Sequence, residues 1–357
     1  MIRVGMVGLG KMGLSHHAIV NTHPDAKVVA ACESNAYVSD VLTQHTALRC
    51  YRSYNDLLEN EELDAVVIST PSRLHADMVS AALARGLHVF CEKPFVLDPA
   101  TGEPLVVEAE TRQVANQVGY HFRFVASFAE AARIARSGAL GAIHHVRAEA
   151  YGPVVLRPKN GTWRAVREEG GGALYDYACH AIDLVNFVMG PPVAVDGVVL
   201  KRVFSRDVED EVYCSMAFAN GAAGQLAVNW SDESYRKMFT RISVWGENGR
   251  VTADRQECQL FLRDTHPALP EMPRGWTVRY GTDLTPPVWF YLRGEEYSAQ
   301  IDYFMQSIKQ RRADGTNSFR SALETDRVVA MILGQPIRQT QPMRAARPAL
   351  LTRVLGR

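Results

Sequence analysis

The segment IRVGMVGLGKMG, residues 2–13, decides the fold of the first part of the chain. Its first six residues concentrate β-forming side chains, and helix-like spacing follows directly after the glycines. The spacing G-x-G-x-x-G lets the first glycine make a tight turn, the second admit a pyrophosphate, and the third pack helix against strand. Free N–H groups at a helix N-terminus also favour phosphate. The candidate dinucleotide contacts in this segment are Gly8, Gly10, Lys11, Met12 and Gly13.

Further apolar runs follow this segment at regular intervals. KVVAACE, LDAVVIST and HVFCEKP have the composition of strands, and helix-like patterns separate them. Strands that alternate with helices predict an α/β fold with a doubly wound parallel sheet. With 357 residues the chain exceeds what one hydrophobic core usually serves, so we expect two domains, residues 1–122 and 123–357.

Glu33 ends the second predicted strand, 20 residues beyond Gly13. A carboxylate at this place accepts hydrogen bonds from both ribose hydroxyls of a dinucleotide. Taken alone, Glu33 is a surface charge at a strand end, and the glycines change that interpretation. Ser34 and Asn35 follow instead of an arginine, so a 2′-phosphate would meet negative charge without a neighbouring cation. The sequence therefore predicts NAD rather than NADP.

Two more strand ends fall on the edge where open α/β sheets bind ligands. The turn after LDAVVIST suits contacts to nicotinamide or ribose, although it also fits a proline-initiated helix start. The run CEKP ends the next strand, where a lone lysine or glutamate is more often solvated. The candidate cofactor contacts at these strand ends are Ser69, Thr70, Pro71, His75, Glu92 and Lys93.

The run GGGALYDYACHAID, residues 170–183, places Asp176, His180 and Asp183 on one side of a predicted helix from about 173 to 189. One interpretation is a capped helix in which Asp176 and His180 form an exposed pair that stabilises the helix by a few tenths of a kcal/mol. The other is a catalytic helix, because three glycines allow close backbone approach to a ligand. A separate cofactor site favours the second interpretation.

The motifs GLGKMG, ACE, STPSRLH, CEKP and GGGALYDYACHAID occur in the order of one enzyme family, and VGYHFRF resembles that family's strand leading out of the nucleotide domain. The chain resembles the glucose–fructose oxidoreductase and myo-inositol dehydrogenase family, written Gfo/Idh/MocA. The resemblance implies a Rossmann domain followed by an α/β domain with a large, mostly antiparallel open sheet. It also implies NAD(P)-dependent oxidation or reduction at a secondary alcohol of a sugar or cyclitol.

By matching position, the resemblance makes Lys93, Asp176 and His180 the catalytic set. Asp183 matches a position that often touches substrate or steadies the histidine. The chain departs from the family at Ser72, where asparagine is frequent, and at Glu33, where aspartate is more common. It also carries Tyr-Ala-Cys before the histidine, where a glycine is common. None of these departures removes a catalytic group.

Imidazole is the usual base for a hydroxyl proton near neutral pH. We therefore expect His180 to exchange the proton, Lys93 to stabilise the developing negative charge, and Asp176 to hold substrate and balance charge. Aromatic and polar side chains around this set suit a sugar, although each alone is more often a packing residue, and Arg123 can instead bridge the domains. The candidate substrate contacts are Lys93, Tyr120, His121, Arg123, Trp163, Arg164, Tyr175, Asp176, His180 and Asp183.

β-rich runs between about 193 and 262 break at Asn220-Gly221 and at Asn248-Gly249, which predicts hairpins of an antiparallel sheet. Several runs carry apolar residues on both faces, so we expect the outer face to join a homodimer or homotetramer. Segments 298–310 and 320–333 are helix candidates expected to return to this domain's core. The basic, proline-broken segment 335–357 predicts a tail or a subunit arm.

The composition excludes several classes of protein. Lys plus Arg equals Asp plus Glu at 39 each, so nothing in the charge favours nucleic acid or an anionic membrane as partner. Six scattered cysteines indicate a reducing compartment, and no basic leader or membrane-length apolar run is evident, so we expect a cytoplasmic protein. The adjacent pairs His16-His17 and His144-His145 lack the spacing of zinc ligands, and we expect no metal.

Two other functions remain open from the sequence. The same fold can use a tightly bound NAD for net epimerisation or glycosidic cleavage, as the resemblance implies. A non-catalytic NAD-binding regulator is the third possibility, and the presence of Lys93, Asp176 and His180 counts against it.

Overall fold

Parallel strands form the first sheet of the chain. The structure is a computed structural model that describes residues 1–46, 48–154 and 162–335. Its first sheet has six strands in the order β3-β2-β1-β4-β5-β6, all parallel. The strands are β1 (Ile2–Val7), β2 (Ala26–Cys32), β3 (Arg49–Tyr51), β4 (Ala65–Ile68), β5 (His88–Cys91) and β6 (Asn116–Val118). Strands β2 and β3 are added on one side of β1, and β4, β5 and β6 are added on its other side. This change of side between β1 and β4 opens a crevice at their carboxyl ends. The predicted doubly wound sheet is confirmed.

Helices connect these strands in the alternation that the sequence predicted. They are α1 (Lys11–Asn21), α2 (Ala36–His45), α3 (Tyr54–Asn60), α4 (His75–Ala84) and α5 (Pro99–Thr111). Side chains of Asn35, Ser53 and Asp98 accept backbone N–H groups at the starts of α2, α3 and α5. The start of α1 at Gly10 has no such side-chain cap, so its first N–H groups stay open to a ligand.

A larger sheet follows, in the order β14-β13-β12-β11-β7-β10-β9-β8. Its neighbours are antiparallel except for β10 and β7. The strands are β7 (Ile143–Tyr151), β8 (Ala194–Lys201), β9 (Glu211–Ala217), β10 (Ala223–Asn229), β11 (Phe239–Gly246), β12 (Gly249–Asp254), β13 (Glu257–Leu262) and β14 (Gly275–Tyr280). Both predicted hairpin breaks, at Asn220-Gly221 and Asn248-Gly249, fall between neighbouring antiparallel strands. The mostly antiparallel open sheet is therefore confirmed.

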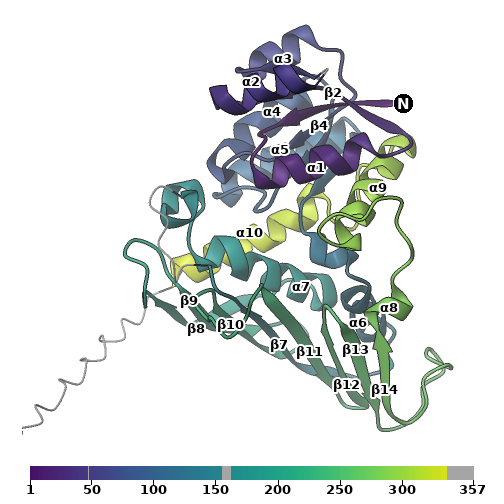
Figure 1. Ribbon diagram of the computed structural model, residues 1–357. Coiled ribbons are helices and arrows are strands. Elements are labelled where there is room, and N and C mark those ends of the chain that lie inside the picture. Colours follow the sequence, from purple (N-terminus) through teal and green to yellow (C-terminus); the bar gives the residue numbers. More distant parts are fainter. Residues whose placement is uncertain (47, 155–161, 336–357) are drawn as a thin grey trace, which may run out of the picture.

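Helices cover the face of this second sheet that looks toward the first sheet (Figure 1). Helix α6 (Ala126–Arg136) packs on β12 and β13, α7 (Cys179–Met189) on β7 and β11, and α10 (Phe319–Gly334) on β8. Helix α10 also contacts α5, so it joins the two halves of the molecule. The short helix α8 (Gly281–Leu284) follows β14.

Helix α9 (Glu295–Lys309) packs against the first sheet and not in the core of the second domain. Its buried residues Ile301, Phe304 and Met305 share one hydrophobic cluster with Val4 and Met6 of β1. The expectation that this helix returns to the second domain is wrong. Periodicity in the sequence reveals the apolar stripe of a helix, but it does not tell which of two sheets the stripe covers.

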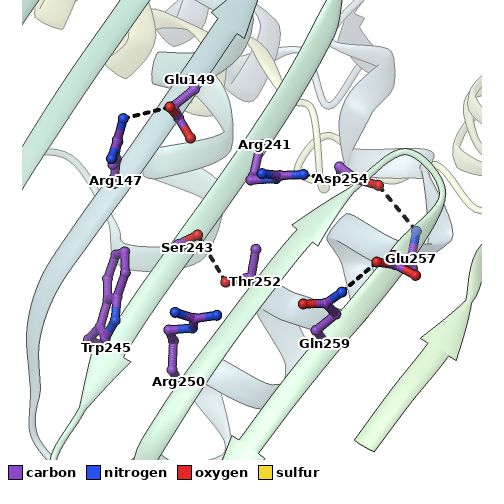
Figure 2. Close-up of a pocket in the computed structure, with 10 residues that line it drawn as sticks. All are labelled: Arg147, Glu149, Arg241, Ser243, Trp245, Arg250, Thr252, Asp254, Glu257 and Gln259. Carbon is purple, nitrogen blue, oxygen red and sulfur yellow. Dashed lines mark hydrogen bonds and ion pairs between the residues drawn. The ribbon is translucent and has the colours of Figure 1, made fainter.

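The outer face of the second sheet is polar at its centre. Strands β12 and β13 alternate strictly between buried and partly exposed residues, and the outward positions of the central strands are largely charged. A hollow of about 420 Å³ lies on this face. Figure 2 shows its lining residues, with Arg147 paired to Glu149 and Arg241 to Asp254. The expectation of apolar residues on both faces is wrong here, and the exposed apolar residues gather on edge strand β14 at Trp276, Val278 and Tyr280.

Within the described ranges, no helix is both long and apolar enough to cross a membrane. Residues 155–161 and residues 336–357 of the predicted tail lie outside the described residues.

Candidate active site between the two sheets

The glycine turn after β1 is shaped by the chain's own packing. Gly8 has φ +84°, and a Cβ on it would lie 2.8 Å from the carbonyl oxygen of Ser69. A Cβ on Gly13 would lie 1.9 Å from the oxygen of Gly8, whereas one on Gly10 would meet nothing within 4 Å. Space above Gly10 and the uncapped start of α1 together make a cradle that fits a pyrophosphate.

Glu33 lies directly against this turn. One of its carboxylate oxygens accepts a hydrogen bond from the backbone N–H of Leu9 at 2.7 Å, and the other accepts from Asn35 N–H at 2.8 Å. Each oxygen keeps a further lone pair for a ribose hydroxyl. The carboxylate therefore stands at the edge of the cradle, with its negative charge fixed there by two backbone donors.

Of the predicted contacts on the neighbouring strand ends, His75 is held by the protein itself. The ring is fully buried, with Nδ1 2.8 Å from the carbonyl oxygen of Pro94 and Nε2 3.1 Å from that of Thr70. Burial lowers its pKa, and the ring packs between the turn after β4 and the turn after β5, where a neutral imidazole can donate to one of the two carbonyls. The hydroxyl of Ser69 is buried without a partner among the described residues.

Glu92 points into the molecule and pairs with a histidine that the sequence analysis did not select. Its carboxylate lies 2.7 Å from Nε2 of the fully buried His16 on α1, and its other oxygen accepts from the N–H of Lys93 at 3.2 Å. Burial would raise the pKa of Glu92, but the hydrogen bond and charge of His16 and the charge of Lys93 outweigh burial and lower it. His16 stands three residues after Gly13, on the inner side of α1, and that position was the available signal.

Lys93, which follows β5 of the first sheet, contacts the segment that leads into α7. Its ammonium donates to a carboxylate oxygen of Asp176 at 2.9 Å and to the backbone carbonyl of the same residue at 3.1 Å. The other carboxylate oxygen of Asp176 accepts from Nε of Arg164 at 2.8 Å. Burial would lower the pKa of Lys93, but the charge of Asp176 and the hydrogen bond to it hold that pKa above its ordinary value. The lysine is therefore a permanent cation, and Asp176 is shared between two cations.

His180 lies on the first turn of α7, with only 5% of its surface exposed. Aromatic rings of three consecutive residues surround it, with centroid distances of 5.9 Å to Tyr120, 5.1 Å to His121 and 5.1 Å to Phe122. Its Nδ1 is buried without a partner among the described residues. Burial, and then the charges of Lys93 and Arg255, lower its pKa well below the ordinary value. The lowered pKa means that the ring is held as a neutral, unprotonated imidazole.

The local backbone brings these groups inward. The segment Leu174–Ala178 is one π-helical turn that leads into α7, and π-turns are frequent at functional sites. Asp176 and His180 are both buried. The alternative of a capped helix with an exposed Asp–His pair is therefore overturned.

The three glycines before this turn lie against other residues of the protein itself. Gly171 and Gly172 donate to the carbonyls of Val166 and Arg164 at 2.9 and 3.1 Å, and a Cβ on Gly171 would lie 2.5 Å from the Arg164 oxygen. The glycines thus let the segment 162–169, here called the arginine turn, fold against the π-helical turn, where Arg164 contacts Asp176. The expectation that they allow approach of a ligand is corrected accordingly.

The remaining predicted substrate contacts lie in different places. Arg123 and Asp183 form a buried bidentate pair with distances of 2.9 and 2.6 Å, so the structure ties Arg123 to α7 and does not bring either residue to a surface that a substrate reaches. The Tyr175 hydroxyl lies 3.5 Å from the carbonyl of Leu97. Trp163 is half-buried, with the guanidinium of Arg164 4.7 Å from its ring centre.

No group of three or more His, Cys, Asp or Glu residues that could hold a metal ion occurs within residues 1–46, 48–154 and 162–335.

Comparisons with known proteins agree with this geometry. Residues 2–120 match the model of an oxidoreductase family with an NAD-binding Rossmann fold, and residues 128–252 match the GFO/IDH/MocA C-terminal domain. A myo-inositol 2-dehydrogenase of Thermotoga maritima is 26% identical over 273 residues, which are 74% of this chain and 78% of that protein. A putative UDP-kanosamine synthase oxidoreductase subunit of Amycolatopsis mediterranei is 28% identical over 354 residues, covering 93% and 94%.

Among solved structures, a levoglucosan dehydrogenase in complex with NADH and levoglucosan has a TM-score of 0.81 at 22% identity. The match covers 93% of this chain and 96% of that one, and it shows a shared fold.

Proposed function

Since the chain belongs to the Gfo/Idh/MocA family of NAD-binding oxidoreductases, we propose that it is an NAD-dependent dehydrogenase of a sugar, sugar derivative or cyclitol. It oxidises a secondary alcohol or reduces the corresponding ketone. The observation that carries this proposal is the contact of Lys93 with Asp176 at 2.9 Å beside the buried, neutral His180. A cation to hold an oxygen and a base to take its proton then face the crevice of the first sheet.

In this proposal, His180 transfers the proton. Nδ1 is enclosed, so Nε2 accepts the hydroxyl proton in oxidation and returns it in reduction. Lys93 hydrogen-bonds the same oxygen and stabilises the charge that develops there. Asp176 holds the lysine in place and offsets its charge. When bound, the nicotinamide supplies the hydride acceptor in oxidation and the hydride donor in reduction.

The cofactor is held by the cradle around Gly8, Gly10 and Gly13 and by Glu33. The backbone N–H groups at the start of α1 suit the pyrophosphate, and the fixed carboxylate of Glu33 suits two ribose hydroxyls. A 2′-phosphate would approach that carboxylate directly, which supports NAD over NADP. Ser69, Thr70 and Pro71 belong to the nicotinamide side, where the turn after β4 lies beside Gly8.

A substrate panel tests the proposal. The relatives named above act on myo-inositol and levoglucosan, so the panel contains myo-inositol, 1,6-anhydroglucose, free sugars and nucleotide sugars, each with NAD and NADP. We expect NADH absorbance to rise with at least one polyol, and to rise less with NADP. Preference for NADP would contradict the role of Glu33. NAD binding with no turnover of any polyol or keto-sugar would favour a regulator, and NAD retained through purification without net NADH would favour epimerisation or glycoside cleavage.

The protein is also proposed to work as a homodimer or homotetramer in the cytoplasm. Support for assembly comes from the outer face of the second sheet, where cations and carboxylates alternate and aromatic residues of β14 stand exposed. A two-fold axis can bring such a face onto itself with opposite charges in contact. The six cysteines are unpaired, in keeping with a reducing compartment.

A further inference from the structure

A second histidine lies against the proposed base. His121 belongs to η2 (His121–Phe124), the short turn that follows β6, and its ring centroid lies 5.1 Å from that of His180 with the planes at 73°. The two residues come from different domains of the chain and meet edge to face. Neither ring is fully enclosed, since 8% of His121 and 5% of His180 is exposed.

The ring of His121 is held rigidly. Tyr297 of α9 stacks on it with a centroid distance of 4.7 Å and an angle of 17°, and Phe122 packs against it at 4.4 Å. Its backbone N–H donates to the carbonyl of Gly119 at 2.9 Å. A side chain packed in this way keeps one orientation, which is what a specificity contact requires.

Both nitrogens of this ring lack a protein partner. Only 8% of His121 is exposed, yet the structure records no hydrogen bond to Nδ1 or Nε2 among the residues it describes. Neither nitrogen is among the enclosed unpartnered atoms, so the small accessible part of the residue includes them. Buried polar groups normally have partners, because leaving one without a partner costs free energy. Because both nitrogens are accessible, a hydroxyl group of a bound substrate can take the place of water at them.

His121 is a neutral imidazole. Burial, and then the charges of His180 and Arg255, lower its pKa well below the ordinary value, and Lys93 adds to this while Glu92 opposes it. A neutral imidazole offers one donor and one acceptor. A hydroxyl group matches that pair, whereas a carboxylate or phosphate would meet the acceptor nitrogen as well as the donor.

We propose that His121 binds the hydroxyl on the carbon next to the reacting one, so that the substrates are vicinal diols and the reverse substrates are α-hydroxy ketones. The inference rests on the proposed function and specifies its substrate class. Hydroxyls on adjacent carbons lie close together, and two imidazoles in contact can each take one of them. His180 takes the hydroxyl that reacts, because it is the histidine beside Lys93 and Asp176. His121 fixes the neighbouring hydroxyl and thereby orients the ring of the substrate.

The test measures enzyme variants at His121 on substrates with and without the neighbouring hydroxyl. The probes are myo-inositol and 1,6-anhydroglucose, each compared with its monodeoxy analogues. The variants are His121→Phe, which keeps an aromatic ring on Tyr297 and removes both nitrogens, and His121→Asn, which keeps a donor and an acceptor. We expect wild-type kcat/KM to fall at least about tenfold when the neighbouring hydroxyl is missing. In His121→Phe this preference disappears, and in His121→Asn part of it returns.

Further readouts separate this role from a structural one. NAD affinity and the pH profile of kcat stay those of the wild type in both variants, because His180 remains the base. A wild type that uses the deoxy analogues as well as the parent polyols overturns the inference without any variant, and so does an unchanged preference in His121→Phe. Absence of turnover of every polyol by the wild type is a different result, because it removes the proposed function itself.

Discussion

Lys93 and Asp176 are separated by 83 residues, yet the lysine ammonium donates both to the carboxylate and to the backbone carbonyl of Asp176, at 2.9 and 3.1 Å. This contact joins the end of β5 in the first domain to the π-helical turn before α7 in the second. The carboxylate is held from its other side by Arg164. The second domain, through Asp176, therefore fixes the charge and the position of Lys93, which belongs to the first domain.

Replacing Lys93 with methionine removes the cation and keeps most of the side-chain volume. We expect kcat to fall about 10²–10³-fold, the usual loss when one donor to a developing oxyanion is removed. NAD affinity, measured by titration of NADH fluorescence, stays within a few-fold of the wild type because the glycine cradle is unchanged. A variant with wild-type kcat would contradict the role of Lys93.

His180→Ala removes the proposed base. General acid–base groups typically contribute about 10²–10⁴-fold, and we expect a loss of kcat in that range with NAD binding retained. Steady-state kinetics on the best polyol of the panel measures the loss. His180→Gln is the matched control, since it keeps a hydrogen-bonding side chain but has no titratable nitrogen, and it should be as slow as alanine. Equal turnover in either variant would exclude His180 as the base.

The pKa of His180 makes a prediction about pH. Oxidation needs the unprotonated ring, so kcat/KM is lost as the pH falls through that pKa. Burial and the charges of Lys93 and Arg255 place the pKa well below the ordinary value, so wild-type activity should stay level at pH values just below about 6.5 and fall only under more acidic conditions.

Arg255→Gln tests that explanation. Arg255 also pairs with Glu296 at 2.5 Å, so the substitution removes a positive charge and frees a negative one. Both changes raise the pKa of His180, and the acid limb of kcat/KM should move toward neutral pH. Arg255→Lys keeps the charge and should leave the limb in place. A limb that does not move in the glutamine variant would show that Arg255 does not act on His180.

Gly171→Ala tests the arginine turn. The added Cβ would lie 2.5 and 2.6 Å from the carbonyl oxygens of Arg164 and Val166, and backbone atoms cannot rotate away. The turn must shift and loosen the hold of Arg164 on Asp176, so we expect kcat/KM to fall about 10–100-fold with unchanged NAD affinity. Gly334→Ala, whose Cβ would meet nothing within 4 Å, is the matched control. Equal activity of the two variants would contradict a role for this turn.

Much of the fold follows from local sequence patterns. The continuous apolar runs of β1, β4 and β5 indicate strands buried on both faces, and the glycines at 8 and 13 are required where backbone meets backbone. The order of these runs and of the motifs at their carboxyl ends is enough to predict the parallel sheet. It also directs attention to Lys93, Asp176 and His180, of which the structure brings Lys93 into contact with Asp176, one turn before His180.

The parts that could not be predicted depend on contacts between distant segments. The position of His16 three residues after Gly13 places it near the glycine turn, but the sequence does not tell that its partner is Glu92. Nothing near Arg255 indicates that it affects His180. From the sequence, the three glycines at 170–172 could make room either for a ligand or for the protein's own backbone. Only the position of Arg164 in the structure decides between these two alternatives. The same limit explains α9, because its apolar stripe fits either sheet.

Arg250→Glu tests assembly through the outer face of the second sheet. The guanidinium of Arg250 lies between two indoles, 5.8 Å from the ring centre of Trp245 and 5.3 Å from that of Trp276, beside the hollow of Figure 2. If a second copy covers this face, reversing the charge places like charges in a desolvated contact, which is strongly unfavourable. We expect the wild type to be a dimer or tetramer by light scattering after size exclusion, and Arg250→Glu to be smaller.

Arg112→Glu, an exposed change directly after α5, is the matched control and should keep the wild-type mass. NAD affinity should be the same in all three proteins, because neither Arg250 nor Arg112 belongs to the cofactor cradle. The face is alternately charged and aromatic, not uniformly apolar, so the assembly should also weaken as salt is added, since salt screens exposed charge pairs. A wild type that is monomeric at micromolar concentration, or an Arg250→Glu variant of wild-type mass, would rule out this face as the contact.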